Sequence, residues 1–363
     1  MTSYFSAKMS YFRSAKPPSP AVDGLPPPPR PPPAAEEPDV EELPPPERAL
    51  LNTLGTAFDA LLARQTGAYP SLATDDLVRA VGASAHTRDV LLLTYLRDAG
   101  GDVPAAVAAL AATLTWRRER RVTTVPGSAV DMPTACWPAY FLGPACEDRR
   151  PGGGGVLLYA PVRQFERRAV ERGAFLDALC AACEGLFYRP PPPPEAVSAA
   201  AAAAPPPGGR RQTPPLGGRY ARRATAIVDF TGWSAFRNVD LPTVKVALKL
   251  FFAHYPNRHG RILLIHYPAG VHAVYRAISP LLSASVVRQI VWVGSGGGES
   301  TVDVLRREVG ADRLPRWLGG DADEPLPAGV DGASLAEALG LAPAPAAAPG
   351  RGGRKALAVP LSG

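Results

Sequence analysis

A repeat of apolar residues at helical spacing begins near Glu47. Its members, which recur every three or four positions, are Leu50, Leu51, Leu54, Phe58, Leu61 and Leu62. This spacing places apolar side chains on one face of a helix. A second helix is predicted over residues 89–98, because Gly100 and Gly101 provide a stop. Asp102 is expected to cap a third helix, which ends at Trp116-Arg117-Arg118. The first ordered part of the chain is therefore predicted to be all helical.

Strands and helices alternate from about residue 156 onward. Short apolar runs predict strands over residues 156–159, 225–230, 261–266 and 290–293. Helices are predicted between them over residues 175–186, 241–254 and 270–282. Another helix opens at Ser300, which forms a capping box with Asp303. The alternation predicts an α/β fold with a mixed, mostly parallel sheet covered by helices and preceded by the helical lobe.

Proline is concentrated in two low-complexity segments. Of the 43 prolines, 14 lie in residues 17–46 and 10 lie in residues 190–215. Such runs adopt polyproline II, so these segments are either solvated linkers or docking strips for polyproline-binding proteins. The second segment separates a helix from the strand over 225–230, which indicates a surface insertion rather than a domain boundary.

The predicted organisation follows from these segments. Residues 1–46 are expected to be disordered and rich in proline, and residues 47–121 to form the helical lobe. Residues 122–321 are expected to form the α/β domain, with a disordered insertion over 189–223. Residues 322–363 are expected to be a flexible tail.

Composition narrows the class of protein. No window of 18 consecutive apolar residues and no secretory signal is found, so a soluble, cytoplasmic chain is expected, with import into a plastid or another organelle left open. The formal net charge of +6 favours anionic partners such as an acidic membrane surface. A single Arg-Gly-Gly unit at residues 351–353 is too little to predict nucleic-acid binding.

Candidate catalytic chemistry is sparse. Cys180 and Cys183 form a C-x-x-C pattern, but they lie within an apolar helical stripe and are expected to pack in the core. The glycines at 294 and 296–298 do not complete a dinucleotide-binding pattern, because Glu299 stands where glycine is needed. No metal site, cofactor or enzymatic activity is predicted.

Five motifs along residues 85–320 resemble the CRAL-TRIO family of lipid-binding and lipid-transfer proteins. The family's first helix is matched by Leu92-Leu93-Thr94-Tyr95-Leu96-Arg97, followed by Asp102, Ala105 and Trp116-Arg117. Its central turn is matched by Tyr255-Pro256-Asn257-Arg258-His259-Gly260-Arg261, its mobile helix by Arg276, Pro280 and Leu282, and its closing motif by Leu314-Pro315-Arg316-Trp317-Leu318-Gly319-Gly320. The same order and spacing predict membership in this family.

The resemblance implies an apolar pocket for one lipid, gated by the helix over 270–282. The residues expected to line it are Tyr159, Tyr188, Phe230, Tyr267, Val271, Val274, Tyr275, Ile278 and Leu282. A lipid headgroup or a membrane surface would be met by Arg258, Arg276 and Arg288. The resemblance thus implies a non-enzymatic lipid carrier that touches membranes transiently. The alternatives are that the apolar stripe of residues 271–282 only fills a core, or that the domain tethers partners to membranes through the proline segments.

The identity of the lipid stays open. Family members that hold phosphatidylinositol carry charged residues at four places, which here are Ala99, Gly100, Asn257 and Gln289. These four residues carry no charge, so the contacts that the family uses to hold the phosphate are absent. A phosphate buried without cations would be poorly compensated. Choline could use the faces of Tyr159 and Tyr188. An apolar ligand such as a sterol, tocopherol or retinoid also stays open.

Overall fold

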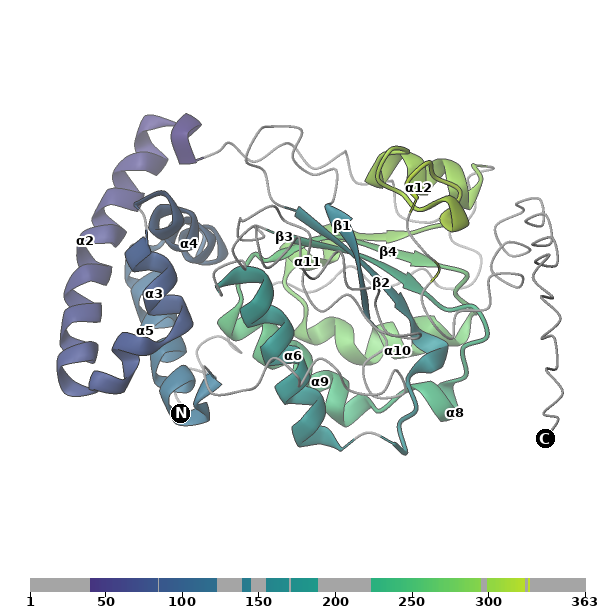
Figure 1. The fold of residues 1–363 in the computed structure, drawn as a ribbon, viewed down its shortest axis with the longest axis horizontal. Coiled ribbons are helices and arrows are strands. Elements are labelled where there is room, and N and C mark those ends of the chain that lie inside the picture. The colour runs from purple at the N-terminus through teal and green to yellow at the C-terminus, as the bar shows by residue number, and fades with distance from the viewer. Residues whose placement is uncertain are drawn as a thin grey trace, which may run out of the picture.

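The fold is seen in a computed structural model, which describes residues 40–83, 85–122, 139–144, 155–169, 171–188, 223–294, 299–323 and 326 (Figure 1). The expectations of disorder in the N-terminal segment and in the insertion concern residues that, apart from a few at the borders, lie outside these ranges. The flexible tail is likewise almost wholly outside them. Among the described residues, no helix combines the length and the apolar character needed to cross a bilayer.

The first described part is the predicted all-helical lobe. Its helices are α2 (Pro45–Ala68), α3 (Asp76–Ala83), α4 (Ala85–Asp98) and α5 (Val103–Arg120). The side chain of Asp102 accepts a hydrogen bond from the backbone N–H of Ala105 at 3.0 Å, which confirms the predicted N-cap of α5. Helix α3 was not predicted, and α4 begins four residues before the expected start.

The rest of the described chain forms a five-stranded sheet with strand order β1-β2-β3-β4-β5. The strands are β1 (Tyr140–Pro144), β2 (Gly155–Pro161), β3 (Arg223–Asp229), β4 (His259–Ile265) and β5 (Ile290–Trp292). Strand β1 is antiparallel to β2, and the four others run parallel. The predicted mixed, mostly parallel sheet is therefore confirmed, with β1 as an edge strand that the sequence pattern did not reveal.

Helices cover both faces of this sheet. They are α6 (Arg172–Phe187), α8 (Ala235–Asn238), α9 (Leu241–His254), α10 (Gly270–Ile278), α11 (Ala284–Gln289) and α12 (Thr301–Val309). Figure 1 shows α12 on one side of the sheet, and α6, α9 and α10 on the other. The predicted gate helix ends at Ile278 and continues as a 3₁₀ turn over Ser279–Leu281. Pro280 explains the change, because proline cannot supply the N–H of the next α-helical hydrogen bond.

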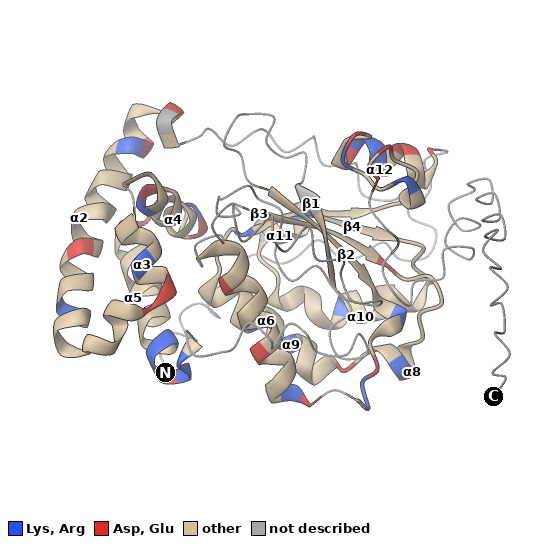
Figure 2. Ribbon diagram, viewed as in Figure 1, with Lys and Arg blue, Asp and Glu red and all other residues tan. Residues whose placement is uncertain are grey.

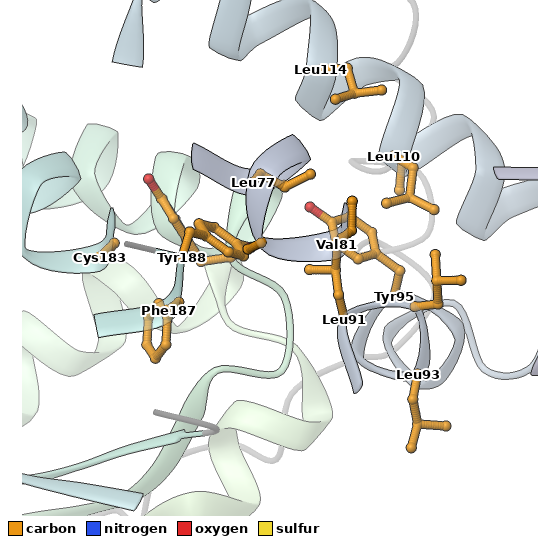
Figure 3. Packing of buried hydrophobic residues seen from close by; sticks show 14 of the residues in the cluster. Leu77, Val81, Leu91, Leu93, Tyr95, Leu110, Leu114, Cys183, Phe187 and Tyr188 are labelled. Atoms are coloured by element: carbon orange, nitrogen blue, oxygen red, sulfur yellow. The ribbon is translucent and has the colours of Figure 1, made fainter. Parts of the chain in front are cut away.

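Two clusters of buried apolar residues hold the molecule together. The first core joins the helical lobe to α6 and α9. Members labelled in Figure 3 are Leu77, Val81, Leu91, Leu93, Tyr95, Leu110, Leu114, Cys183, Phe187 and Tyr188. The second core lies between the sheet and α12; it includes Leu157, Tyr159, Ile227, Leu263, Val304 and Leu305. The sheet is thus packed tightly against α12 on one face.

A buried ion network locks the lobe onto the α/β domain. The Arg117 guanidinium of α5 donates to both carboxylate oxygens of Glu184 on α6, at 2.7 and 2.6 Å, and to Asp75 at 2.7 Å. The hydroxyl of Tyr255 donates to the same Glu184 carboxylate at 2.7 Å. Burial by itself lowers the pKa of Arg117, but the two carboxylates outweigh it and raise that pKa well above its usual value. The network fixes how α5 and α6 meet.

Candidate functional site

The two faces of the sheet differ in how completely they are buried. On the face toward α12, Tyr159, Ile227 and Leu263 are paired in register and are fully buried. Alternate residues of the same strands point to the opposite face, since successive side chains of a strand alternate. The first face is therefore an ordinary packed core.

The second face is apolar but only partly covered. Its central residues are Leu158, Ala160, Ala226, Val228 and Ile262, all half-buried. Among the described residues, none of these five belongs to either core. Two of the five, Ala160 and Ala226, present only a methyl group. The face is therefore a partly exposed apolar surface with small side chains at its centre.

Helix α10 lies over the β5 end of this second face. Its Tyr275 meets the indole of Trp292 edge to face at 5.3 Å, and its His272 stacks on the same ring at 4.6 Å. Tyr267, just before the helix, contacts Trp292 edge to face at 4.9 Å. Trp292 pairs in register with Leu264, which shares the second face with Ile262. Trp292 is thus the sheet residue against which α10 packs.

These ring contacts hold α10 only moderately. An edge-to-face pair contributes about 0.5–1.5 kcal/mol beyond the area that it buries. Of the helix residues themselves, Val271 alone is fully buried, whereas Val274, Tyr275 and Ile278 are half-buried. Burial raises the pKa of Tyr275, so its phenol stays neutral at physiological pH. Helix α10 is therefore only partly buried against the sheet.

A polar cluster lies where the parallel strands end, close to the start of α10. The Asp229 carboxylate accepts hydrogen bonds from the hydroxyl of Tyr159 at 2.5 Å and from the backbone and hydroxyl of Thr231 at 2.9 and 2.7 Å. The Nδ1 atom of His266 lies 3.1 Å from the same carboxylate. Burial raises the pKa of Asp229, but the bonds from His266, Tyr159 and Thr231 outweigh it and lower that pKa. The cluster fixes the loops before α8 and α10.

The structure gathers seven of the nine predicted pocket residues around α10. Val271, Val274, Tyr275 and Ile278 lie on α10 itself, and Tyr267, Phe230 and Leu282 lie in the segments that adjoin the helix or the ends of the strands. Phe230 follows β3 directly, and its ring meets that of Trp233 edge to face at 5.9 Å. Leu282 is buried just after the 3₁₀ turn.

Tyr159 and Tyr188 lie elsewhere. Tyr159 is on the sheet face toward α12, where its ring meets that of Trp317 edge to face at 5.0 Å. Tyr188 ends α6 in the first core, with the guanidinium of Arg117 5.2 Å from its ring centroid. Tyr159 thus points away from the face on which α10 lies, whereas the core that holds Tyr188 reaches the sheet at Val156 and Ala224. That these two side chains line a lipid pocket stays a prediction. Their aromatic character alone did not tell which side of the sheet or helix they occupy.

The three arginines expected to meet a headgroup or membrane are separated by the fold. Arg258 is buried before β4, with its guanidinium 5.1 Å from the ring centroid of Phe187. Arg276 is exposed on α10, and Arg288 is exposed on α11. Only the last two are accessible to a surface. Arg258 instead packs between α6 and the start of the sheet.

The cysteine pair of α6 is placed as predicted. Cys180 and Cys183 are buried free thiols. Burial raises the pKa of Cys180 to about 11 and that of Cys183 well above its usual value. Since the thiolate is the reactive form, both side chains are suited to packing rather than to redox chemistry.

Comparison with known proteins agrees with the sequence motifs. Residues 210–320 match the family model described as CRAL/TRIO domain. The predicted resemblance to this family of lipid-binding proteins is confirmed over these residues. Among solved structures, the chain is similar to one titled "Crystal structure of Sfh5", at 11% identity and a TM-score of 0.42, over 68% of this chain and 79% of that chain.

Proposed function

We propose that the protein binds one hydrophobic lipid between the second face of its sheet and helices α9 and α10, and that it transfers or presents this lipid at membranes without catalysing a reaction. The observation that carries the proposal is the contrast between the two faces of the sheet. One face is packed as a core, whereas Leu158, Val228 and Ile262 on the other face stay half-buried beneath covering helices. The family match to residues 210–320 supports the same class of ligand.

The energetics explain why the lipid would be enclosed. Exposing an acyl chain of about 16 carbons to water costs on the order of 13 kcal/mol, at about 0.8 kcal/mol for each CH₂ group. Moving the chain directly from a bilayer to an apolar pocket avoids most of that cost. Loading is therefore expected while α10 touches a membrane, where the contacts that Trp292 makes with the helix can be replaced.

The polar end of the lipid is expected to contribute less to selection than the apolar part. The positions where phosphatidylinositol-binding relatives carry charges are Ala99, Gly100, Asn257 and Gln289 in this chain. The five central residues of the second face carry no polar side-chain group. We therefore expect a phospholipid held mainly through its chains, or a ligand such as a sterol, tocopherol or retinoid.

Substitutions on α10 test the proposal directly. Tyr275→Asn removes the ring that packs on Trp292 and places an amide over the apolar face, so lipid transfer between vesicles is expected to fall about tenfold or more. Ala273→Asn makes the same amide on the exposed side of the same helix and is the matched control. Transfer is followed with a fluorescent lipid and neutral vesicles, and circular dichroism confirms that both variants fold. Equal transfer rates for the two variants would contradict the placement of the lipid.

A further inference from the structure

Phe236 is the most exposed large apolar side chain among the described residues. Its side chain is 86% exposed, whereas the others in this class, Leu50, Tyr69, Val246 and Leu326, lie between 39% and 43%. Leaving a phenylalanine in water forgoes most of the free energy that its burial would provide. Single exposed apolar residues are common in proteins, so exposure alone does not identify a partner. The residues around Phe236 indicate which kind of partner it would meet.

The exposure does not come from a loose segment. Phe236 lies on α8, and the side chain of Asn238 ties this short helix to the turn after β2 by donating to the backbone oxygens of Arg163 and Phe165 at 2.9 and 2.7 Å. The same side chain accepts from the backbone N–H of Ser234 at 2.7 Å. The backbone that carries Phe236 is therefore fixed, and its ring is presented outward.

Three arginines lie on Phe236's own helix or on the segment bonded to it. Arg237 is its neighbour in the chain, and the backbone N–H of Arg167 donates to the Arg237 oxygen at 2.9 Å, which brings Arg167 and Arg168 against α8. All three side chains are exposed, and none forms an ion pair with another described residue. Figure 2 shows basic residues on α8 and on the loop that leads into α6.

The acidic groups nearby do not cancel this charge. Glu166 lies in the same turn, which leaves the three arginines in excess. Glu171 is already engaged as the N-cap of α6, where it accepts from the backbone N–H groups of Gly173 and Ala174. Asp240 accepts from the hydroxyl of Thr243 at 2.5 Å. We name Phe236, Arg167, Arg168 and Arg237 the α8 tip, an apolar anchor set in a basic surface.

We propose that the α8 tip docks on an anionic phospholipid bilayer, with Phe236 inserted among the lipids and the arginines against their headgroups. Stable attachment to a membrane surface takes an apolar and an electrostatic contribution together, and the tip supplies both. A bilayer is favoured over an acidic protein surface because the proposed function already brings a membrane to α10, and the vesicle experiments below decide between the two.

The tip also lies beside the gate. Trp233, three residues before Phe236, packs against the start of α10: a side-chain carbon added to Gly270 would lie 3.3 Å from its ring. A bilayer that holds the α8 tip therefore reaches the helix through which the lipid would pass. This link between the α8 tip and lipid entry at α10 rests on the proposed function.

Binding of the full-length protein to vesicles tests the proposal. We expect stronger flotation with vesicles of phosphatidylcholine and phosphatidylserine than with phosphatidylcholine alone, and weaker binding as salt rises. Phe236→Ser is expected to weaken binding about tenfold. The control Leu50→Ser removes an apolar side chain that is 40% exposed on α2, at the far end of the molecule in Figure 1, and should bind as the wild type does.

The charges are tested in the same way. The double variant Arg167→Gln with Arg168→Gln is expected to weaken binding roughly 25-fold, since each basic residue near an anionic surface contributes about a fivefold factor. Arg64→Gln with Arg79→Gln lowers the net charge equally at exposed positions of the helical lobe and is the matched control. Equal binding of test and control variants, or equal binding of the wild type to both kinds of vesicle, would overturn the proposal.

The outcome can be separated from that of the proposed function. Native mass spectrometry of Phe236→Ser measures the lipid that the protein still holds. A variant that keeps its lipid but no longer binds vesicles supports the α8 tip as the docking surface. A wild-type protein that binds anionic vesicles through Phe236 yet holds no lipid supports the tip while contradicting the carrier role. Wild-type protein that binds no vesicles at all refutes the tip.

Discussion

Replacing Glu184 by glutamine is expected to destabilise the protein strongly, although the two side chains have nearly the same shape. The Glu184 carboxylate is fully buried and accepts three hydrogen bonds, two from Arg117 and one from Tyr255. If the amide oxygen of glutamine takes the place of Oε1, it keeps the bonds from Nη1 of Arg117 and from Tyr255. The amide nitrogen then faces Nη2 of Arg117, so that two donors oppose each other.

The magnitude follows from the loss of one charge in a buried network. A hydrogen bond to a charged group contributes about 1.5–3 kcal/mol. Removing one partner of a buried ion pair costs about 3–5 kcal/mol, because the remaining charge is left poorly compensated. Asp75, at 2.7 Å from Arg117, limits the loss but cannot replace the bidentate contact. We therefore expect the free energy of unfolding to fall by about 3–5 kcal/mol.

Urea denaturation followed by circular dichroism measures the effect. With an m-value of about 2–3 kcal/mol/M, the midpoint of unfolding should fall by about 1–2 M. Asp177→Asn is the matched control, because Asp177 of α6 pairs with Arg120 of α5 between the same two helices but is 48% exposed. Exposed ion pairs contribute about 0–1 kcal/mol, so the control should stay close to the wild type. A loss below about 1 kcal/mol for Glu184→Gln would refute the reasoning.

Two further predictions concern glycine positions and the polar cluster at the end of β3. Gly320→Ala should lower the free energy of unfolding by about 2 kcal/mol or more, because the new methyl group would lie 1.9 Å from the backbone oxygen of Leu314. The matched control is Gly82→Ala in α3, where no heavy atom lies within 4 Å of the new methyl group. It should raise the free energy of unfolding by about 0.5–1 kcal/mol. Asp229→Asn should cost about 1–3 kcal/mol at pH 7. Since the pKa of Asp229 is lowered in the fold, its contribution is complete above the unfolded value near pH 4 and is lost as the pH falls further, so wild type and variant should converge in acid-denaturation curves.

The elements that the sequence predicted best are those with local signals. The helix over 241–254 was placed with both ends correct, since its apolar spacing and the following Tyr-Pro turn are read within one segment. The capping box at Ser300 is likewise local: its hydroxyl accepts from the backbone N–H of Asp303 at 3.1 Å. Strand β1, with five residues and a bulge in its pairing, has too short a pattern to stand out.

The candidate site was predicted only in part, because its geometry depends on contacts between distant segments. The residues of α10 were found from one helical stripe and a family resemblance. Ala160, Ala226 and Trp292 were missed, since strands of a parallel sheet are apolar on both faces and do not show which face is less covered. For the same reason the sequence could not show that Tyr159 lies on the face toward α12. The burial of Arg117 depends on Asp75 and Glu184, which are 42 and 67 residues away in the chain.

The central claim is that one lipid lies between the second face of the sheet and α10. Native mass spectrometry of the full-length protein, after incubation with vesicles of mixed lipids and their removal, tests it most directly. The account predicts a complex of one lipid per chain, reduced in Tyr275→Asn and unchanged in Ala273→Asn. A folded wild-type protein that emerges without bound lipid would contradict it.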